Sequence, residues 1–191
     1  MKTLLTFFVL LFSSSVLADD ISDLQIEGMS IGDSLLDYYN EEEINSFRTY
    51  SYQNKEFYSM DLINTSLTFK IYDGMQVQIK TNDRSFIIHA ISGALFFEDF
   101  EFNKCMNKLE NIKKEILRLY TNYSKEEYHS SHPEDDDSKI YSYYMILNEG
   151  EISFQCTQWS KKYAKKQNLY HNLRVSVFTK DFSNWLQYKA Y

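Results

Sequence analysis

The chain has 191 residues, a formal net charge of −7 at pH 7, and only 5 Gly and 1 Pro. Because nucleic acids attract basic proteins, the acidic balance argues against a nucleic-acid partner. The low Gly and Pro content argues against a disordered or low-complexity chain.

Residues 1–18 have the pattern of a secretory signal peptide. Lys2 supplies a positive charge, Leu4 to Phe12 form an apolar run too short to span a bilayer, and small residues lead up to Ala18. We expect cleavage near Ala18 and a periplasmic or secreted protein, with no transmembrane segment in the mature chain. Residues 19–191 are expected to form a single α+β domain.

Short helices are predicted near the start of this domain. Ser30 with an acid three residues later resembles a capping box and predicts a helix over Ile31 to Tyr39. Asn40 with Glu43 predicts a second short helix that runs to Phe47. A strand is predicted over residues 56–62.

Apolar and polar residues alternate from Leu67 to Ile91, which predicts three half-buried antiparallel strands. A three-residue loop that ends in Gly74 would pair Phe69 with Val77 and keep the apolar residues on one face. A two-residue loop would then pair Val77 with Ile88. Another layer must cover this apolar face.

A long amphipathic helix is predicted from Asn103 to about Tyr123 as the cover for that face. Its apolar residues recur at spacings of three and four: Cys105, Leu109, Ile112, Ile116, Leu119 and Tyr123. Residues 124–138, which are polar and acidic and contain the only Pro, are predicted to form an exposed loop.

A second hairpin is predicted over residues 140–147 and 151–158. A three-residue loop that ends in Gly150 would pair Tyr144 with Phe154. A basic segment, irregular or helical, then precedes a strand over residues 173–178 and a last helix capped by Thr179 or Asp181.

These elements together predict an α+β fold. An antiparallel β-sheet of about six or seven strands, built from hairpins, is expected to pack on the long helix. Short N-terminal and C-terminal helices complete the fold, and the helices are expected largely on one face.

The two cysteines, Cys105 and Cys156, are expected to form a disulfide, because exported proteins with two cysteines most simply pair them. The bond would close a loop of about 50 residues and stabilise the fold by about 4 kcal/mol. The alternative is two buried free thiols.

Two serines match patterns found in serine hydrolases. Ser30 fits G-x-S-x-G, and Ser34 lies in a Gly-Asp-Ser-Leu stretch that resembles the GDSL (SGNH) hydrolases. Either serine would be the nucleophile of an esterase. Those hydrolases also need an Asp-x-x-His base motif, which is absent from this sequence, and a parallel α/β sheet. We therefore expect a protein that is not an enzyme and needs no cofactor, with the esterase as an alternative.

A second candidate site lies in the acidic segment. His129 and His132, with Asp135 nearby, offer imidazole and carboxylate ligands for zinc or another divalent ion. The spacing matches no known closed site, so a solvated acidic loop is the expectation and metal binding the alternative.

The third candidate is a basic and aromatic patch. It consists of Trp159, Lys161, Lys162, Tyr163, Lys165 and Lys166. Such a patch could bind an anionic glycan, a phosphate headgroup or an acidic partner, and the alternative is a charged exposed turn.

The stretch from Ile26 to Tyr39, followed by Tyr72-Asp73-Gly74, Ile91-Ser92-Gly93 and residues 173–177, resembles uncharacterised small exported proteins of AT-rich marine alphaproteobacteria. This resemblance implies an exported domain without an assigned activity.

The opening residues Ile26, Gly28, Met29 and Ser30 are also similar to the start of the BamE (SmpA/OmlA) domain. That similarity implies a helical pair, a three-stranded antiparallel sheet over Leu67 to Ile91 and, by analogy, a role in envelope assembly. This chain departs from the BamE pattern because it has no lipobox Cys and no Gly-x-Pro after the first helix, and it continues well beyond the sheet. The sequence thus predicts an exported, non-enzymatic binding or interaction module whose partner is an envelope protein or a small ligand.

Overall fold

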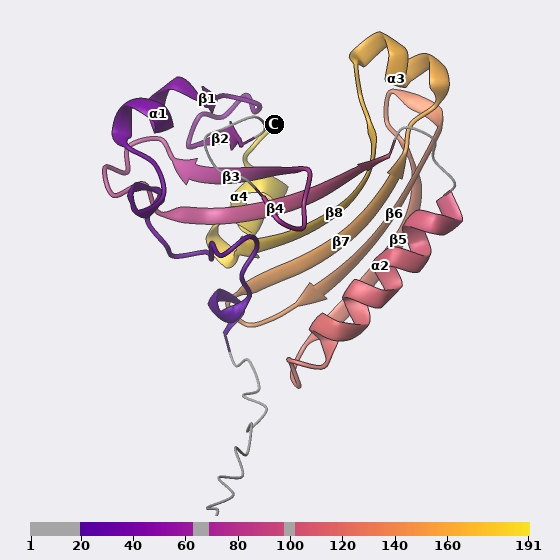
Figure 1. The fold of residues 1–191 in the computed structure, drawn as a ribbon, viewed down its shortest axis with the longest axis horizontal. Helices are drawn as coiled ribbons and strands as arrows, with labels where there is room; N and C mark the ends of the chain where they lie inside the picture. Colours follow the sequence, from indigo (N-terminus) through magenta and orange to yellow (C-terminus); the bar gives the residue numbers. More distant parts are fainter. Residues whose placement is uncertain (1–19, 63–68, 98–101) are drawn as a thin grey trace, which may run out of the picture.

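The computed structural model describes residues 20–62, 69–97 and 102–191. The predicted signal peptide and Leu67 lie outside these residues. Within them the chain forms one eight-stranded sheet in which every neighbouring pair of strands is antiparallel (Figure 1). The prediction of an antiparallel sheet in an α+β fold is confirmed.

The strands lie in the order β1 (Arg48–Thr49), β2 (Phe57–Asp61), β3 (Gly74–Lys80), β4 (Ile88–Phe97), β8 (His171–Thr179), β7 (Gly150–Gln158), β6 (Asp135–Ile146) and β5 (Ser124–His132). The helices are α1 (Glu41–Ser46), α2 (Phe102–Leu117), α3 (Lys161–Gln167) and α4 (Lys180–Tyr188), with 3-10 turns η1 (Ile21–Asp23) and η2 (Leu35–Asp37). None of the helices in the described ranges combines the length and the apolar composition of a membrane-spanning helix.

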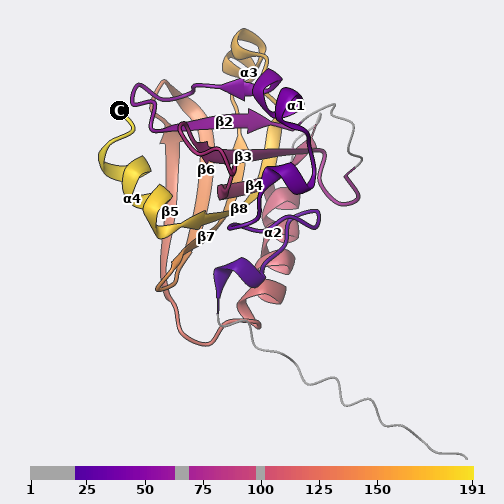
Figure 2. The same cartoon turned by 90° about the vertical axis from the view of Figure 1, so that its left-hand side faces the viewer.

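Helices cover both faces of the sheet (Figure 2). α2 packs on one face against β7 and β8, whereas α4 packs on the other face against β4, β7 and β8. The alternation along β8 explains this arrangement, since Val175 and Val177 belong to the core beneath α2 and Phe178 belongs to a second cluster with Phe182 and Trp185 of α4. The expectation that the helices lie largely on one face is wrong.

α2 is shorter than the predicted helix. It ends at Leu117, so the helix buries Cys105, Leu109 and Ile116 but not the last two residues of the predicted stripe. Leu119 and Tyr123 are exposed, because the chain has already left the helix to enter β5 at Ser124.

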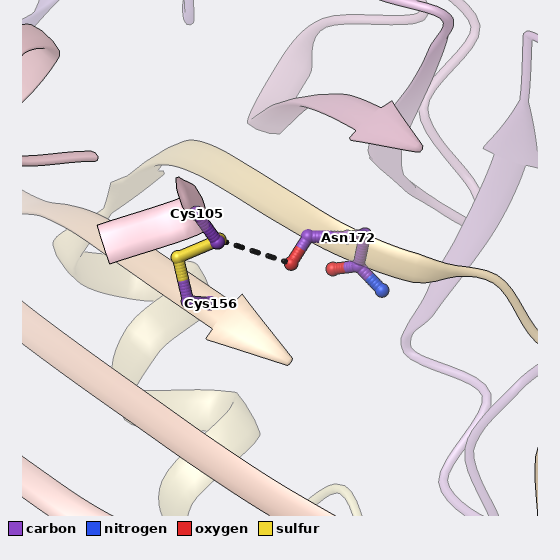
Figure 3. The surroundings of a disulfide bond; sticks show 3 residues. All are labelled: Cys105, Cys156 and Asn172. Atoms are coloured by element: carbon purple, nitrogen blue, oxygen red, sulfur yellow. Dashed lines mark hydrogen bonds between the residues drawn. A yellow bond between two sulfur atoms is a disulfide. The ribbon is translucent and has the colours of Figure 1, made fainter. Parts of the chain in front are cut away.

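The disulfide between Cys105 and Cys156 fastens α2 to β7, with the two Cα atoms 6.1 Å apart (Figure 3). Both cysteines are completely buried, and the Cys105 Sγ lies 3.8 Å from the carbonyl oxygen of Asn172 in β8. The predicted pairing is confirmed, and it joins the covering helix to the centre of the sheet.

The first predicted hairpin is wrong. β3 begins at Gly74, and residues 69–73 do not form a strand. Val77 lies opposite Met60 of β2 and Ile91 of β4, rather than opposite Phe69 and Ile88. The alternating pattern identified β3, β4 and their antiparallel pairing, but it missed β2 as the other neighbour of β3 and gave the wrong register.

A turn near the N-terminus holds residues 70–72 outside the sheet. Ile26 and Met29 exchange two backbone hydrogen bonds across a two-residue turn in which Glu27 and Gly28 both have positive φ, 53° and 85°. The turn presents the Glu27 carboxylate, which accepts hydrogen bonds from the backbone N–H groups of residues 70–72. Those donors are therefore unavailable to a neighbouring strand.

The predicted exposed loop over residues 124–138 is also wrong. It forms β5, the start of β6 and the turn between them. Eight of the nine residues of β5 are exposed, because β5 lies at the edge of the sheet and pairs only with β6. An edge strand needs only backbone pairing on one side, so its polar composition does not reveal it.

The second predicted hairpin forms, between β6 and β7, but its register differs by one residue. Phe154 lies opposite Tyr143 rather than Tyr144, because the N–H of Leu147 donates to the carbonyl of Gly150 and leaves a two-residue connection. Gly150 is needed for close packing, since an added Cβ would lie 2.0 Å from the carbonyl oxygen of Phe178.

The capping predictions have mixed outcomes. Asn40 and Glu43 form the predicted capping box of α1, and Thr179, rather than Asp181, caps α4. The predicted helix from Ile31 is reduced to η2, which is capped by Ser34 instead of Ser30.

Candidate binding site

Two of the predicted sites meet at one end of the sheet. His132, at the end of β5, contacts the rings of Trp159 and Tyr163, with centroid distances of 5.1 and 5.2 Å. The Trp159 and Tyr163 rings lie 5.7 Å apart. We call α3, Trp159 and the β5–β6 turn over residues 132–135 the α3 tip; it is visible beside the label α3 in Figure 1.

Ser160 and Asn168 define the ends of α3. The Ser160 side chain accepts a hydrogen bond from the N–H of Tyr163, and Asn168 ends the helix in the left-handed conformation with φ 54°. The N–H of Ser160 donates to the Ser138 hydroxyl, 2.8 Å away, and that hydroxyl in turn donates to the Asp135 carboxylate. The hydroxyl of Ser138 lowers the pKa of Asp135 from its ordinary value. Short polar contacts thus join α3 to the β5–β6 hairpin.

The aromatic side chains of the α3 tip are held by hydrogen bonds at their polar ends. The Trp159 indole N–H donates to the carbonyl of Tyr170 at 3.0 Å, and the Tyr163 hydroxyl donates to the Glu134 carboxylate at 2.8 Å. The bond to Glu134 raises the pKa of Tyr163 from its ordinary value. Each ring is therefore held by a hydrogen bond at its polar end and by contacts with the neighbouring rings.

Four lysines surround these rings on the outer side of α3. Lys161, Lys162, Lys165 and Lys166 are all exposed, while Tyr163 is half-buried against the hairpin. Among the described residues, the ion pairs join other side chains and leave these four lysines without a carboxylate partner. All six residues of the predicted basic and aromatic patch therefore lie together.

The other side of the α3 tip is acidic. Glu134, Asp136 and Asp137 are exposed in and beside the β5–β6 turn. The tip therefore carries a basic surface on α3 beside an acidic surface on the hairpin.

The proposed metal ligands are arranged for other contacts. His129 stacks on Tyr141, with centroids 4.8 Å apart, and lies 3.9 Å from Glu127. His132 pairs across the strands with Asp135, but its Nδ1 accepts a hydrogen bond from the N–H of Glu134. In residues 20–62, 69–97 and 102–191, no group of three or more His, Cys, Asp or Glu side chains could hold a metal ion.

The two candidate nucleophiles make structural contacts. The Ser34 hydroxyl donates to the carbonyl of Ser85 at 2.6 Å and accepts from the N–H of Leu36, so it caps η2. Ser30 is buried, and its N–H donates to the Asp33 carboxylate. A nucleophile elbow requires a serine between a strand and a helix of a parallel sheet, beside a histidine base. The local structure around Ser30 and Ser34 lacks that arrangement.

The sequence identified the patch residues but missed the role of His132 as one of the three clustered rings. That role follows from the position of His132 at the end of an edge strand. This position can be recognised only when the register of β5 against β6 is known. Comparison with protein-family models, with curated proteins and with solved structures finds no match for this chain. The identification of the α3 tip as a candidate site therefore depends on its geometry alone.

Proposed function

We propose that this protein is an exported, non-enzymatic binding module that recognises a protein partner of the envelope through the α3 tip. The observation that carries the proposal is the set of four exposed lysines, without a carboxylate partner among the described residues, beside the ring cluster of Trp159 and Tyr163. Aromatic rings are enriched in the cores of protein interfaces, and charged groups such as these lysines belong to the polar rims around them.

The charge arrangement on α3 is unfavourable for the isolated protein. Lys161 with Lys165, and Lys162 with Lys166, are like-charge pairs at a spacing of four, each of which costs about 0.2–0.5 kcal/mol. The first two lysines also lie in the first turn, where the helix dipole disfavours cations. Carboxylates of a bound partner would relieve this repulsion.

The acidic surface beside α3 favours a protein as the partner. A polyanion such as nucleic acid or an anionic membrane would be attracted by the lysines and repelled by Glu134 and Asp136. A protein can present both charges in the matching arrangement.

Two further features support an exported location. Residues 1–18 have the pattern of a signal peptide. The buried disulfide between Cys105 and Cys156 is of a kind that persists in oxidising compartments.

Affinity capture from a bacterial envelope fraction tests the proposal. The bait variant replaces the four α3 lysines with Gln, and the control variant makes the same charge change at Lys108, Lys114, Lys125 and Lys189, which are also exposed. We expect a defined protein to bind the wild type and the control but not the α3 variant. Equal capture by all three proteins, or none by the wild type, would refute the proposal.

A further inference from the structure

The α4-facing side of the sheet is polar along almost its whole width. One row of mutually opposite residues crosses seven strands. It consists of Asp61, Gln76, Ser92, Ser176, Ser153, Tyr144 and Glu126. We call these residues the polar row.

The neighbouring row contains an arginine at its centre. Arg174, in the interior strand β8, lies opposite Ala94 of β4 and Gln155 of β7. Since Leu173 and Val175 belong to the core beneath α2, Arg174 points to the polar side. Small side chains beside Arg174, such as Ala94 and Ser176, leave the guanidinium as the largest group at this point of the sheet.

Among the described residues, Asp61 and Tyr52 act electrostatically on the half-buried Arg174 without forming a hydrogen bond to its Nε. Its Nε is buried and makes no hydrogen bond, and no carboxylate lies within ion-pair distance. Asp61 is near enough to act on it electrostatically but accepts a hydrogen bond from Gln76 at 2.7 Å instead. Burial lowers the pKa of Arg174 from its ordinary value, with Asp61 opposing the shift.

α4 covers only one end of this face. Its Phe182 and Trp185 pack on Phe57 and Phe178, and Tyr52 contacts Trp185 edge to face with centroids 5.0 Å apart. Arg174 borders this apolar cluster, since Tyr52 acts on it electrostatically. A buried N–H group without a hydrogen-bond partner is costly, so the Nε of Arg174 is a group that a ligand could complete.

We propose that Arg174 is the anchor of a binding site for a small organic anion with a carboxylate, on the polar side of the sheet. The planar guanidinium matches a carboxylate through two parallel N–H donors. Gln155, Ser142 and Ser153 lie alongside and supply further hydrogen-bonding groups for polar parts of the ligand. The site is separate from the α3 tip and does not depend on the function proposed for it.

The electrostatics favour a monoanionic carboxylate over phosphate. Asp61 and Glu126 lie at the two ends of the polar row, and the whole chain carries a charge of −7. These charges repel a doubly charged phosphate about twice as strongly as a carboxylate.

Nuclear magnetic resonance of the arginine Nε–H groups tests the site directly in the full mature chain. Acetate, gluconate and inorganic phosphate are titrated separately against sodium chloride of equal ionic strength. We expect a saturable shift of the Arg174 signal with the two carboxylates only. The Arg174→Lys variant should weaken binding at least about tenfold, because it keeps the charge but loses the paired donors.

Two further variants distinguish the loss of a binding site from a general disturbance of the fold. Asp61→Asn should tighten carboxylate binding roughly two- to threefold by removing a repulsive charge. Arg48→Lys is the matched control, because Arg48 also has an unpaired Nε but lies over the Tyr58 ring at 4.1 Å, and it should bind as the wild type does. No saturable shift of the Arg174 signal, a preference for phosphate, or unchanged affinity in Arg174→Lys would overturn the proposal. The four-lysine α3 variant should retain the shift, which separates this test from that of the α3 tip.

Discussion

The Glu27 carboxylate accepts a hydrogen bond from the backbone N–H of Tyr72, 2.9 Å away, as one of three successive amide contacts. This contact places the Tyr72 ring directly over Gly93 of β4, where an added Cβ would lie 2.6 Å from the ring. A turn near the N-terminus thereby fixes a loop against the centre of the sheet.

Replacing Glu27 by Gln should destabilise the protein by about 1 kcal/mol at pH 7, because the three hydrogen bonds lose the charge of their acceptor and become weaker. Burial raises the pKa of Glu27, but the three backbone donors outweigh it and hold the pKa below 4.5. The stabilisation is therefore present above pH 4.5 and is lost as the pH falls through the lower folded value. Urea unfolding at neutral and acidic pH should show the difference between variant and wild type shrink in acid. A difference independent of pH, or one matched by the exposed control Glu115→Gln, would contradict this role.

The packing of Tyr72 on Gly93 predicts a coupled pair of substitutions. Gly93→Ala should cost about 1–3 kcal/mol, because the new methyl group overlaps the ring. The same substitution should cost much less in a Tyr72→Ala background, where the ring is absent. A double-mutant cycle of unfolding free energies measures this coupling, and strict additivity would show that the ring does not occupy that position.

Loss of the disulfide should be among the most damaging single changes. Cys156→Ser opens a loop with a sequence separation of 51, which corresponds to about 4 kcal/mol of unfolding free energy. The Cys105→Ser variant should lose the same amount, since both remove one bond. Thermal or urea unfolding of the oxidised wild type and the two variants checks this. Wild-type stability that is unaffected by a reductant would contradict it.

Ser34 provides a test of the esterase alternative. Because its hydroxyl caps η2 and bonds to the Ser85 carbonyl, Ser34→Ala should reduce stability by about 1 kcal/mol. A fluorophosphonate probe should label neither the wild type nor this variant. Labelling of the wild type that disappears in Ser34→Ala would restore Ser34 as a nucleophile.

The elements that the sequence predicted correctly are those with local signals. From Leu173 to Val177, β8 alternates apolar and polar residues, and Thr179 supplies a cap three residues before a buried Phe182. Such patterns depend on neighbours within a few residues of the chain.

The failures arise from contacts between distant residues. Residues 69–73 alternate like a strand, but the backbone of residues 70–72 is held by Glu27, more than forty positions earlier. β5 has no apolar alternation because it lies at the edge of the sheet. Arg174 is an ordinary polar position in an alternating strand, and the buried Nε without a hydrogen bond in the described part of the chain is visible only once the sheet is assembled.

The central claim is that the α3 tip is the surface that a partner binds, and photo-crosslinking tests it most directly. A photoreactive amino acid is placed at Lys162 on α3 or at Lys108 on α2, which is also exposed, and the protein is irradiated in the bacterial envelope. We predict that the Lys162 position yields a covalent adduct with one defined protein and that the Lys108 position yields none. Adducts from Lys108 alone, or no adduct from Lys162, would contradict the account.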